Sequence, residues 1–174
     1  MANEIERKFI VEQKHHHLFI DRRHDSYLEQ MYLQTNPTVR VTYEEHHGKE
    51  VGWIAVKGAP REGGLVRSEW EYEIPAAEAR AMMAEFSTAP IIKKVRHEID
   101  VNGDIWEVDV LYFLDRELKR LVVAEIEKPS LDEARNVELP YWVGREVTGD
   151  RRFSMATIAQ PGCLIVACNL AYGV

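Results

Sequence analysis

The sequence has few cysteines and no excess of positive charge, and each absence excludes a class of protein. Its two cysteines, Cys163 and Cys168, are too few for a disulfide framework and lack the second pair of a metal-binding motif, so we expect two reduced thiols. The formal net charge is -7 and the pI about 5.5. This balance argues against a protein that covers a nucleic-acid backbone with a broad basic surface.

The chain also lacks the patterns of an exported or membrane-embedded protein. Its N-terminus carries Asn3, Glu4 and Glu6 where a signal peptide has a basic and then an apolar segment, and no apolar run reaches the roughly 18 residues of a membrane span. We therefore expect a cytoplasmic protein that binds neither membrane nor nucleic acid. With 174 residues, of which 45% are hydrophobic, the chain can build one core. We predict a single domain over residues 1–174.

Strand-like segments separated by turn residues are abundant. Segments rich in β-branched and aromatic residues predict strands over 3–11, 27–33, 38–46, 51–58, 66–74, 93–101, 105–112 and 121–127. Gly, Asn and Pro predict turns at "TNPT", "HHGK", "APREGG" and "VNGD". The pattern is typical of an antiparallel β protein.

Helix signals are fewer. "PAAEARAMMAEF" predicts a helix with Pro75 at its first helical position, and "SLDEARN" predicts one that begins with a capping box of Ser130 and Glu133. A third helix is predicted from Asp150 through "RRFSMATIA". The polar, His-rich connection over residues 12–26 is expected to be helical in part.

Charged side chains alternate along the predicted strands. Because side chains of a strand point to opposite faces in turn, residues two apart share a face. Seven of the eight predicted strands carry a charged stripe of this kind, formed by Glu4, Glu6 and Lys8; Arg40; Lys57; Arg67, Glu69, Glu71 and Glu73; Lys94, Arg96 and Glu98; Glu107 and Asp109; Glu125 and Glu127. Ordinary antiparallel sheets with one solvated face would also show such stripes. However, a merely soluble surface mixes both signs within a strand, whereas here acidic and basic strands are largely separate.

This separation favours a barrel with its charged faces inward and its apolar faces outward. Roughly fifteen ionised groups cannot lie in a dry core, since removing one ion from water costs several kcal/mol unless it is paired or bound to metal. The interior must therefore be wet and wide. Clustered carboxylates suit a hard cation such as Mg²⁺ or Mn²⁺, and clustered Lys and Arg suit phosphate oxygens. The residues thus predict a polyphosphate ligand.

These residues resemble a known family, the CYTH domain or triphosphate tunnel metalloenzymes. Its Glu-x-Glu-x-Lys signature appears here as Glu4, Glu6 and Lys8 in "EIERK". The resemblance extends over about residues 3–160, through "VRV", "VKG", "RSEWEYEIP", "KKVRHEI", "WEVDV", "VVAEIE" and "LPYWVGREVTGDRRF", and the tail over 160–174 matches nothing in the family. It implies a mainly β (α+β) fold, a closed eight-stranded antiparallel barrel with a few outer helices.

The resemblance also implies site residues. Its catalytic residues fall here on Glu4, Glu6 and Lys8. Its metal ligands, for two Mg²⁺ or Mn²⁺ ions, fall on Glu4, Glu6, Glu69, Glu71, Asp109, Glu125 and Glu127. Its triphosphate-binding residues fall on Lys8, Arg40, Lys57, Arg67, Lys94 and Arg96. Thr42 departs from the pattern, because many members have a second arginine there, and one phosphate contact is expected to be weaker or supplied elsewhere.

The function implied most directly is hydrolysis of inorganic tripolyphosphate, a small-molecule substrate, to pyrophosphate and phosphate. Three alternatives stay open: a class IV type adenylyl cyclase, a thiamine triphosphatase, and a barrel that binds polyphosphate or nucleotide without turnover. The oligomeric state is not readable from the sequence, although an apolar sheet exterior is compatible with a homodimer.

Overall fold

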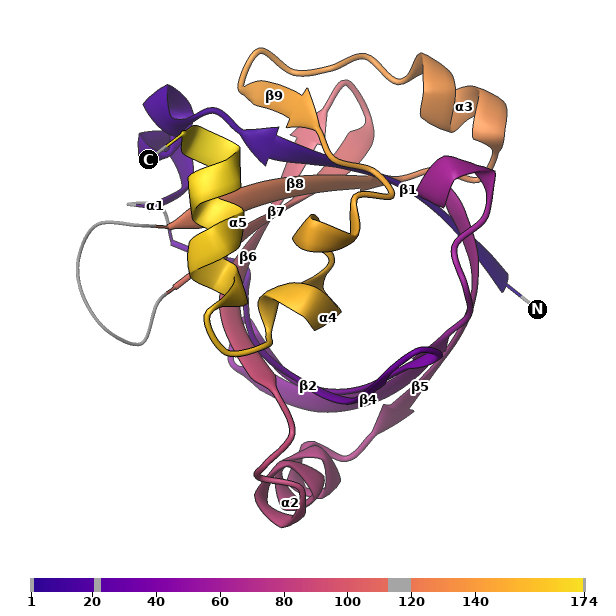
Figure 1. Ribbon diagram of the computed structural model, residues 1–174, viewed down its shortest axis with the longest axis vertical. Helices are drawn as coiled ribbons and strands as arrows, with labels where there is room; N and C mark the ends of the chain where they lie inside the picture. The colour runs from indigo at the N-terminus through magenta and orange to yellow at the C-terminus, as the bar shows by residue number, and fades with distance from the viewer. Residues whose placement is uncertain (1, 21–22, 113–119, 174) are drawn as a thin grey trace.

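The computed structural model describes residues 2–20, 23–112 and 120–173. One antiparallel sheet closes on itself into a barrel, which Figure 1 shows end-on as a ring. Its strands are β1 (Ala2–Val11), β2 (Ser26–Thr35), β3 (Thr38–His46), β4 (Lys49–Lys57), β5 (Val66–Ile74), β6 (Ile91–Val101), β7 (Asp104–Leu111) and β8 (Leu121–Glu127). They pair in the order β5-β4-β3-β2-β6-β7-β8-β1, and a further pairing of β1 with β5 closes the ring. The predicted closed eight-stranded barrel is confirmed, and the predicted strands agree within two residues at each end.

Strand β1 changes partner along its length. Residues 2–5 pair with β5, and residues 6–10 pair with β8. Farther along, Phe9 and Val11 also pair with a ninth strand, β9 (Val143–Glu146), which the sequence pattern did not predict. Its four residues, "VGRE", contain a single β-branched side chain and no alternation, so they give little strand signal. The signature residues of β1 therefore lie where the ring closes.

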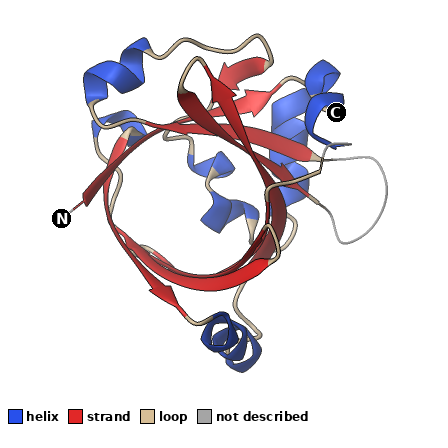
Figure 2. Cartoon of the chain, turned by 180° about the vertical axis from the view of Figure 1, so that it is seen from behind, coloured by secondary structure: helices blue, strands red, loops and turns tan. Residues whose placement is uncertain are grey.

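The predicted inversion of polar and apolar faces is also confirmed. On the outer face of β1, β6, β7 and β8, buried residues such as Phe9, Val95, Trp106 and Ile126 pack in one apolar cluster with Trp142 and Phe19. The inner faces of the same strands carry the charged stripes. On the opposite side of the ring, α2 (Ala76–Glu85) covers the outside of β3 and β4 (Figure 2).

The structure has helices where they were predicted before β2, after Pro75 and after Ser130, but the role of Pro75 differs from the prediction. The connection before β2 contains η1 (Gln13–His15) and α1 (His17–Ile20), and "APREGG" contains η2 (Glu62–Gly64). Pro75 is the N-cap of α2 instead of its first helical residue, because its backbone is extended. In α3 (Leu131–Asn136), Ser130 Oγ accepts a hydrogen bond from the Glu133 amide at 3.2 Å, which confirms the cap.

The single helix predicted from Asp150 is wrong. Two short helices, η3 (Arg151–Phe153) and α4 (Met155–Ile158), occupy this segment. They are separate because Ser154 has an extended backbone and its hydroxyl accepts a hydrogen bond from the Thr157 amide, which starts a new helix.

The tail forms α5 (Cys163–Tyr172), which carries both cysteines, and neither is in a disulfide. Together, α4 and α5 lie across one end of the ring (Figure 1). Apolar side chains of these two helices pack in one cluster with inward side chains of the strands. The members of this cluster include Ile10, Ile92, Leu111, Leu121, Val123, Phe153, Met155, Ile158 and Ala167. This end of the barrel is therefore packed, whereas the middle holds a cavity lined by charged side chains. Within the described residues, no helix has the length and apolar character to cross a membrane.

Candidate active site in the barrel interior

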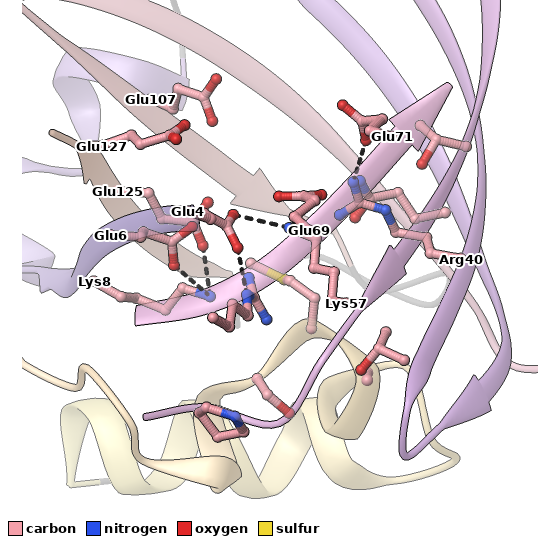
Figure 3. Close-up of a pocket in the computed structure, with 18 of the residues that line it drawn as sticks. Glu4, Glu6, Lys8, Arg40, Lys57, Glu69, Glu71, Glu107, Glu125 and Glu127 are labelled. Carbon is pink, nitrogen blue, oxygen red and sulfur yellow. Dashed lines mark hydrogen bonds and ion pairs between the residues drawn. The ribbon is translucent and has the colours of Figure 1, made fainter. Parts of the chain in front are cut away.

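The middle of the barrel holds a cavity of about 1200 Å³. Of the thirteen candidate residues, twelve line it: Glu4, Glu6, Lys8, Arg40, Lys57, Arg67, Glu69, Glu71, Lys94, Arg96, Glu125 and Glu127. They come from six strands, and Figure 3 shows many of their side chains pointing toward one another. The thirteenth, Asp109, is fully buried behind this lining.

Glu4 lies between two cations, one from β5 and one from β4. Its carboxylate accepts hydrogen bonds from Lys57 Nζ, at 2.9 Å, and from Arg67 Nε (Figure 3). Lys57 Nζ also lies 3.0 Å from an oxygen of Glu69. Burial by itself would raise the pKa of Glu4, but the charges of Lys57 and Arg67 outweigh burial and lower the pKa to about 2. Glu4 is therefore ionised at neutral pH.

Lys8 pairs with the acid directly opposite it on β8. Its Nζ lies 2.5 Å from Glu125 Oε1 and 3.9 Å from Glu6 Oε1. Burial opposes ionisation of both partners, yet the pKa of Glu125 is lowered by Lys8, Lys94 and Arg96. The pKa of Lys8 is raised by Glu125 and Glu6 against the effect of burial. Both groups are thus held in their charged forms.

Asp109 holds two of the candidate phosphate-binding cations. Its carboxylate accepts hydrogen bonds from Arg96 Nε at 2.7 Å, from Arg96 Nη2 at 2.9 Å and from Lys94 Nζ. Burial would raise the pKa of Asp109, but Arg96 and Lys94 lower it. The resemblance implied a metal ligand here, and this role stays a prediction; in the structure both oxygens of Asp109 accept hydrogen bonds from Lys94 and Arg96.

This pairing could have been found in the sequence. The "VNGD" hairpin pairs Val101 with Asp104, and counting back along both strands from that turn places Arg96 opposite Asp109. The register of a short hairpin follows from its turn, so the contact was implicit in the predicted turn.

Glu6 and Glu127 are two acids of the cavity wall whose pKa values are raised. Burial, followed by the charge of Glu125, raises the pKa of Glu6 to about 7 against the opposing effect of Lys8. Burial and the charges of Glu4 and Glu69 raise the pKa of Glu127. Among the described residues, no three His, Cys, Asp or Glu side chains are already arranged around a metal position. The chemistry of these carboxylate groups, however, suits a hard divalent cation, which would relieve their mutual repulsion.

The raised pKa of Glu6 predicts a pH-dependent difference in stability between the wild type and Glu6→Gln. Between its ordinary value of 4.5 and about 7, Glu6 keeps its proton in the folded state and loses it in the unfolded state, so its ionisation destabilises the fold as the pH rises. Glu6→Gln should therefore melt at a higher temperature than the wild type at pH 8 in EDTA. The difference should shrink as the pH falls through about 7 and vanish near 4.5.

Thermal melts at matched ionic strength measure this difference. The exposed Glu45 of β3 provides the control, because Glu45→Gln removes a carboxylate outside the cavity and should change the melting temperature little. A Glu6→Gln difference that does not depend on pH would contradict the assignment.

The sequence reasoning missed several residues of the cavity wall. Some are neutral residues on inward faces: Leu28, Gln30, Tyr32 and Trp53. The alternation of side chains could have identified these, because each shares a strand face with a known inward position or pairs with one. Others, such as Asn36, Pro60 and Thr157, come from loops or from α4, and no strand pattern points to them.

A scan against protein-family models found no match. Among curated proteins, the chain is 37% identical over 153 residues to an inorganic triphosphatase of Acetivibrio thermocellus, covering 88% of this chain and 90% of that protein. It is 31% identical over 158 residues to an inorganic triphosphatase of Nitrosomonas europaea, covering 90% of this chain and 96% of that protein.

Solved structures show the same architecture. The crystal structure of the hypothetical protein NE1496 aligns with a TM-score of 0.56 at 27% identity, over 90% of this chain and 97% of its own. A crystal structure of the inorganic triphosphatase NE1496 aligns with a TM-score of 0.55 at 24% identity, over 91% and 95% of the two chains. The PH1819 protein of Pyrococcus horikoshii, with a TM-score of 0.52 and 17% identity over 76% and 82% of the two chains, shares the fold.

Proposed function

Because this chain belongs to the CYTH, or triphosphate tunnel metalloenzyme, family together with the inorganic triphosphatases that it matches, we propose that it hydrolyses inorganic tripolyphosphate. The products are pyrophosphate and phosphate. The observation that carries this proposal is the joint lining of one cavity by carboxylates and by Lys and Arg side chains from strands all around the ring. A linear polyanion that also binds divalent metal matches both kinds of side chain.

The charge of the cavity supports a metal-dependent reaction. Ten acidic and eight basic side chains of the described residues line the cavity, so the wall has no excess of positive charge to offset a triphosphate. We propose that Glu6 and Glu127, with Glu4, Glu69, Glu71 and Glu125 around them, hold two Mg²⁺ or Mn²⁺ ions. Metal bound there would neutralise phosphate charge and help to orient the attacking water.

The cationic side chains of the chain itself position the substrate. Lys8, Arg67 and Lys57 come from β1, β5 and β4, which follow one another at the closure of the ring. Arg40 extends from β3 on another part of the wall (Figure 3). Guanidinium groups can contact phosphate oxygens through two parallel hydrogen bonds. We propose that these four residues align the three phosphates while Asp109 fixes Lys94 and Arg96 from behind.

The reaction requires no covalent intermediate. Water attacks the terminal phosphorus, the bond from that phosphorus to the bridging oxygen breaks, and pyrophosphate leaves with the bridging oxygen. A carboxylate of the cavity wall accepts the proton of the water. Phosphoryl transfer depends mainly on positioning and charge stabilisation, both of which a lined cavity supplies.

Measuring phosphate release from tripolyphosphate with and without Mg²⁺, beside cyclic AMP formation from ATP, tests the proposal. We expect Mg²⁺-dependent phosphate release and no cyclic AMP. Formation of cyclic AMP would support the adenylyl cyclase alternative. Faster phosphate release from thiamine triphosphate than from tripolyphosphate, in the same assay, would support the thiamine triphosphatase alternative. Tight binding with no product would favour a sensor, and any of these three outcomes would overturn the proposal.

We also propose that residues 1–174 form one domain, because α5 in the tail packs into the apolar cluster at one end of the barrel. The cytoplasmic location, the homodimer and the absence of other partners stay predictions.

A further inference from the structure

The wall formed by β3 carries two buried polar atoms that the described residues leave unpaired. These atoms are the Oγ1 of Thr42 and the Nε of Arg40. Both residues line the cavity, and Thr42 is only 2% exposed. A buried hydroxyl without a partner destabilises a fold, because it gives up hydrogen bonds to water without replacement. Such groups are rare in folded proteins, so each requires an explanation.

The polar neighbours of Thr42 direct their known hydrogen bonds elsewhere. Its cross-strand neighbours are Gln30 on β2 and Trp53 on β4. Trp53 Nε1 donates to Glu44 at 3.0 Å, and Gln30 Oε1 accepts from the hydroxyl of Tyr32 at 3.3 Å. The Thr42 hydroxyl therefore remains available to a ligand in the cavity.

Thr42 and Arg40 present two donors along one strand. They share the inward face of β3, about 6.6 Å apart at the usual rise of a strand. Arg40 Nη2 donates to Glu71 at 2.9 Å, whereas Nε is buried and has no partner among the described residues. The same strand thus presents one neutral and one charged donor to the interior, and oxygens of an anion suit both.

We propose that the Thr42 hydroxyl donates a hydrogen bond to a phosphate oxygen of the substrate, next to Arg40 Nε. Thr42 is then a substrate-contacting residue that recognises phosphate without adding charge to the wall. This inference rests on the proposed function, since it takes the triphosphate as the ligand of the cavity.

The substitution Thr42→Val separates binding from stability, because valine has the shape of threonine without the hydroxyl. We expect KM for tripolyphosphate to rise roughly tenfold, the loss typical of one hydrogen bond to a charged group, with a smaller change in kcat. The melting temperature without substrate should rise by about 2 to 4 °C, since an unpaired buried hydroxyl is removed. Thr42→Ser, which keeps the hydroxyl, should restore the affinity.

Thr38 provides a matched control on the same strand and the same face. Its hydroxyl already donates to the carbonyl oxygen of Thr35 at 3.2 Å. Thr38→Val should therefore lower the melting temperature and leave KM for tripolyphosphate within about twofold of the wild type.

Steady-state kinetics with tripolyphosphate and thermal melts of the full chain decide the matter. An unchanged KM in Thr42→Val overturns the proposal, and so does a lowered melting temperature, which would show that the hydroxyl has a structural partner. If the wild type hydrolyses tripolyphosphate and the Thr42→Val variant has the same KM, only this inference fails and the proposed function stands. If the wild type neither binds nor hydrolyses tripolyphosphate, the proposed function fails first.

Discussion

Replacing Glu4 and Glu6 together by glutamine should abolish metal-dependent phosphate release and lower kcat/KM for tripolyphosphate by at least about 100-fold. Glutamine keeps the size of both side chains but removes two negative charges from the acidic side of the cavity. Metal affinity should fall because a neutral amide is a poorer ligand for a hard divalent cation than a carboxylate. Phosphate release over a range of Mg²⁺ concentrations measures the effect.

The double substitution also changes the ion pairs of the cavity, and its control must account for this. Lys57 and Arg67 both lose the carboxylate of Glu4, so the variant should first be shown to fold by circular dichroism. Glu45→Gln, on an exposed position of β3, removes one charge outside the cavity and should retain activity. Full activity of the Glu4→Gln, Glu6→Gln variant would refute the site.

Asp109→Ala should destabilise the fold by about 3 to 5 kcal/mol, the typical cost of leaving buried charges without their partner. The side chain of Asp109 is 0% exposed and that of Lys94 is 2% exposed, so both charges are shielded from bulk water. Arg96 keeps Glu107 and Glu125 as partners, whereas Lys94 loses its only acid contact among the ion pairs of the described residues. Urea denaturation of the two proteins measures the difference in the free energy of unfolding.

Asp104 offers a matched comparison on the same strand. It pairs with Lys128, but its side chain is 31% exposed, so Asp104→Ala should cost less than about 1 kcal/mol. If the Asp109→Ala variant kept wild-type stability and lost only the dependence of its phosphate release on Mg²⁺, Asp109 would be a metal ligand instead of the partner of Lys94 and Arg96.

The strands and their faces could be predicted because the signal is local. In "RSEWEYEI", alternation alone separates the acidic face of β5 from Trp70 and Tyr72, and the structure places Glu69 and Glu71 in the cavity wall. The same reasoning failed for β9 and at the break at Ser154. A four-residue strand has too few positions to show a period, and the Ser154 cap competes with a helical pattern that reads as continuous.

The sequence by itself determined that ionised side chains share one face of nearly every strand, because that property depends only on positions two residues apart. Except for the hairpin pair of Arg96 and Asp109, only the tertiary structure decided which acid meets which cation. Glu4 lies 53 residues from Lys57 and 63 from Arg67 in the sequence, and they meet because β1 closes the ring against β5. The packing of α4 and α5 against one end of the barrel also depends on closure, since their apolar partners come together only when separate strands share an interior.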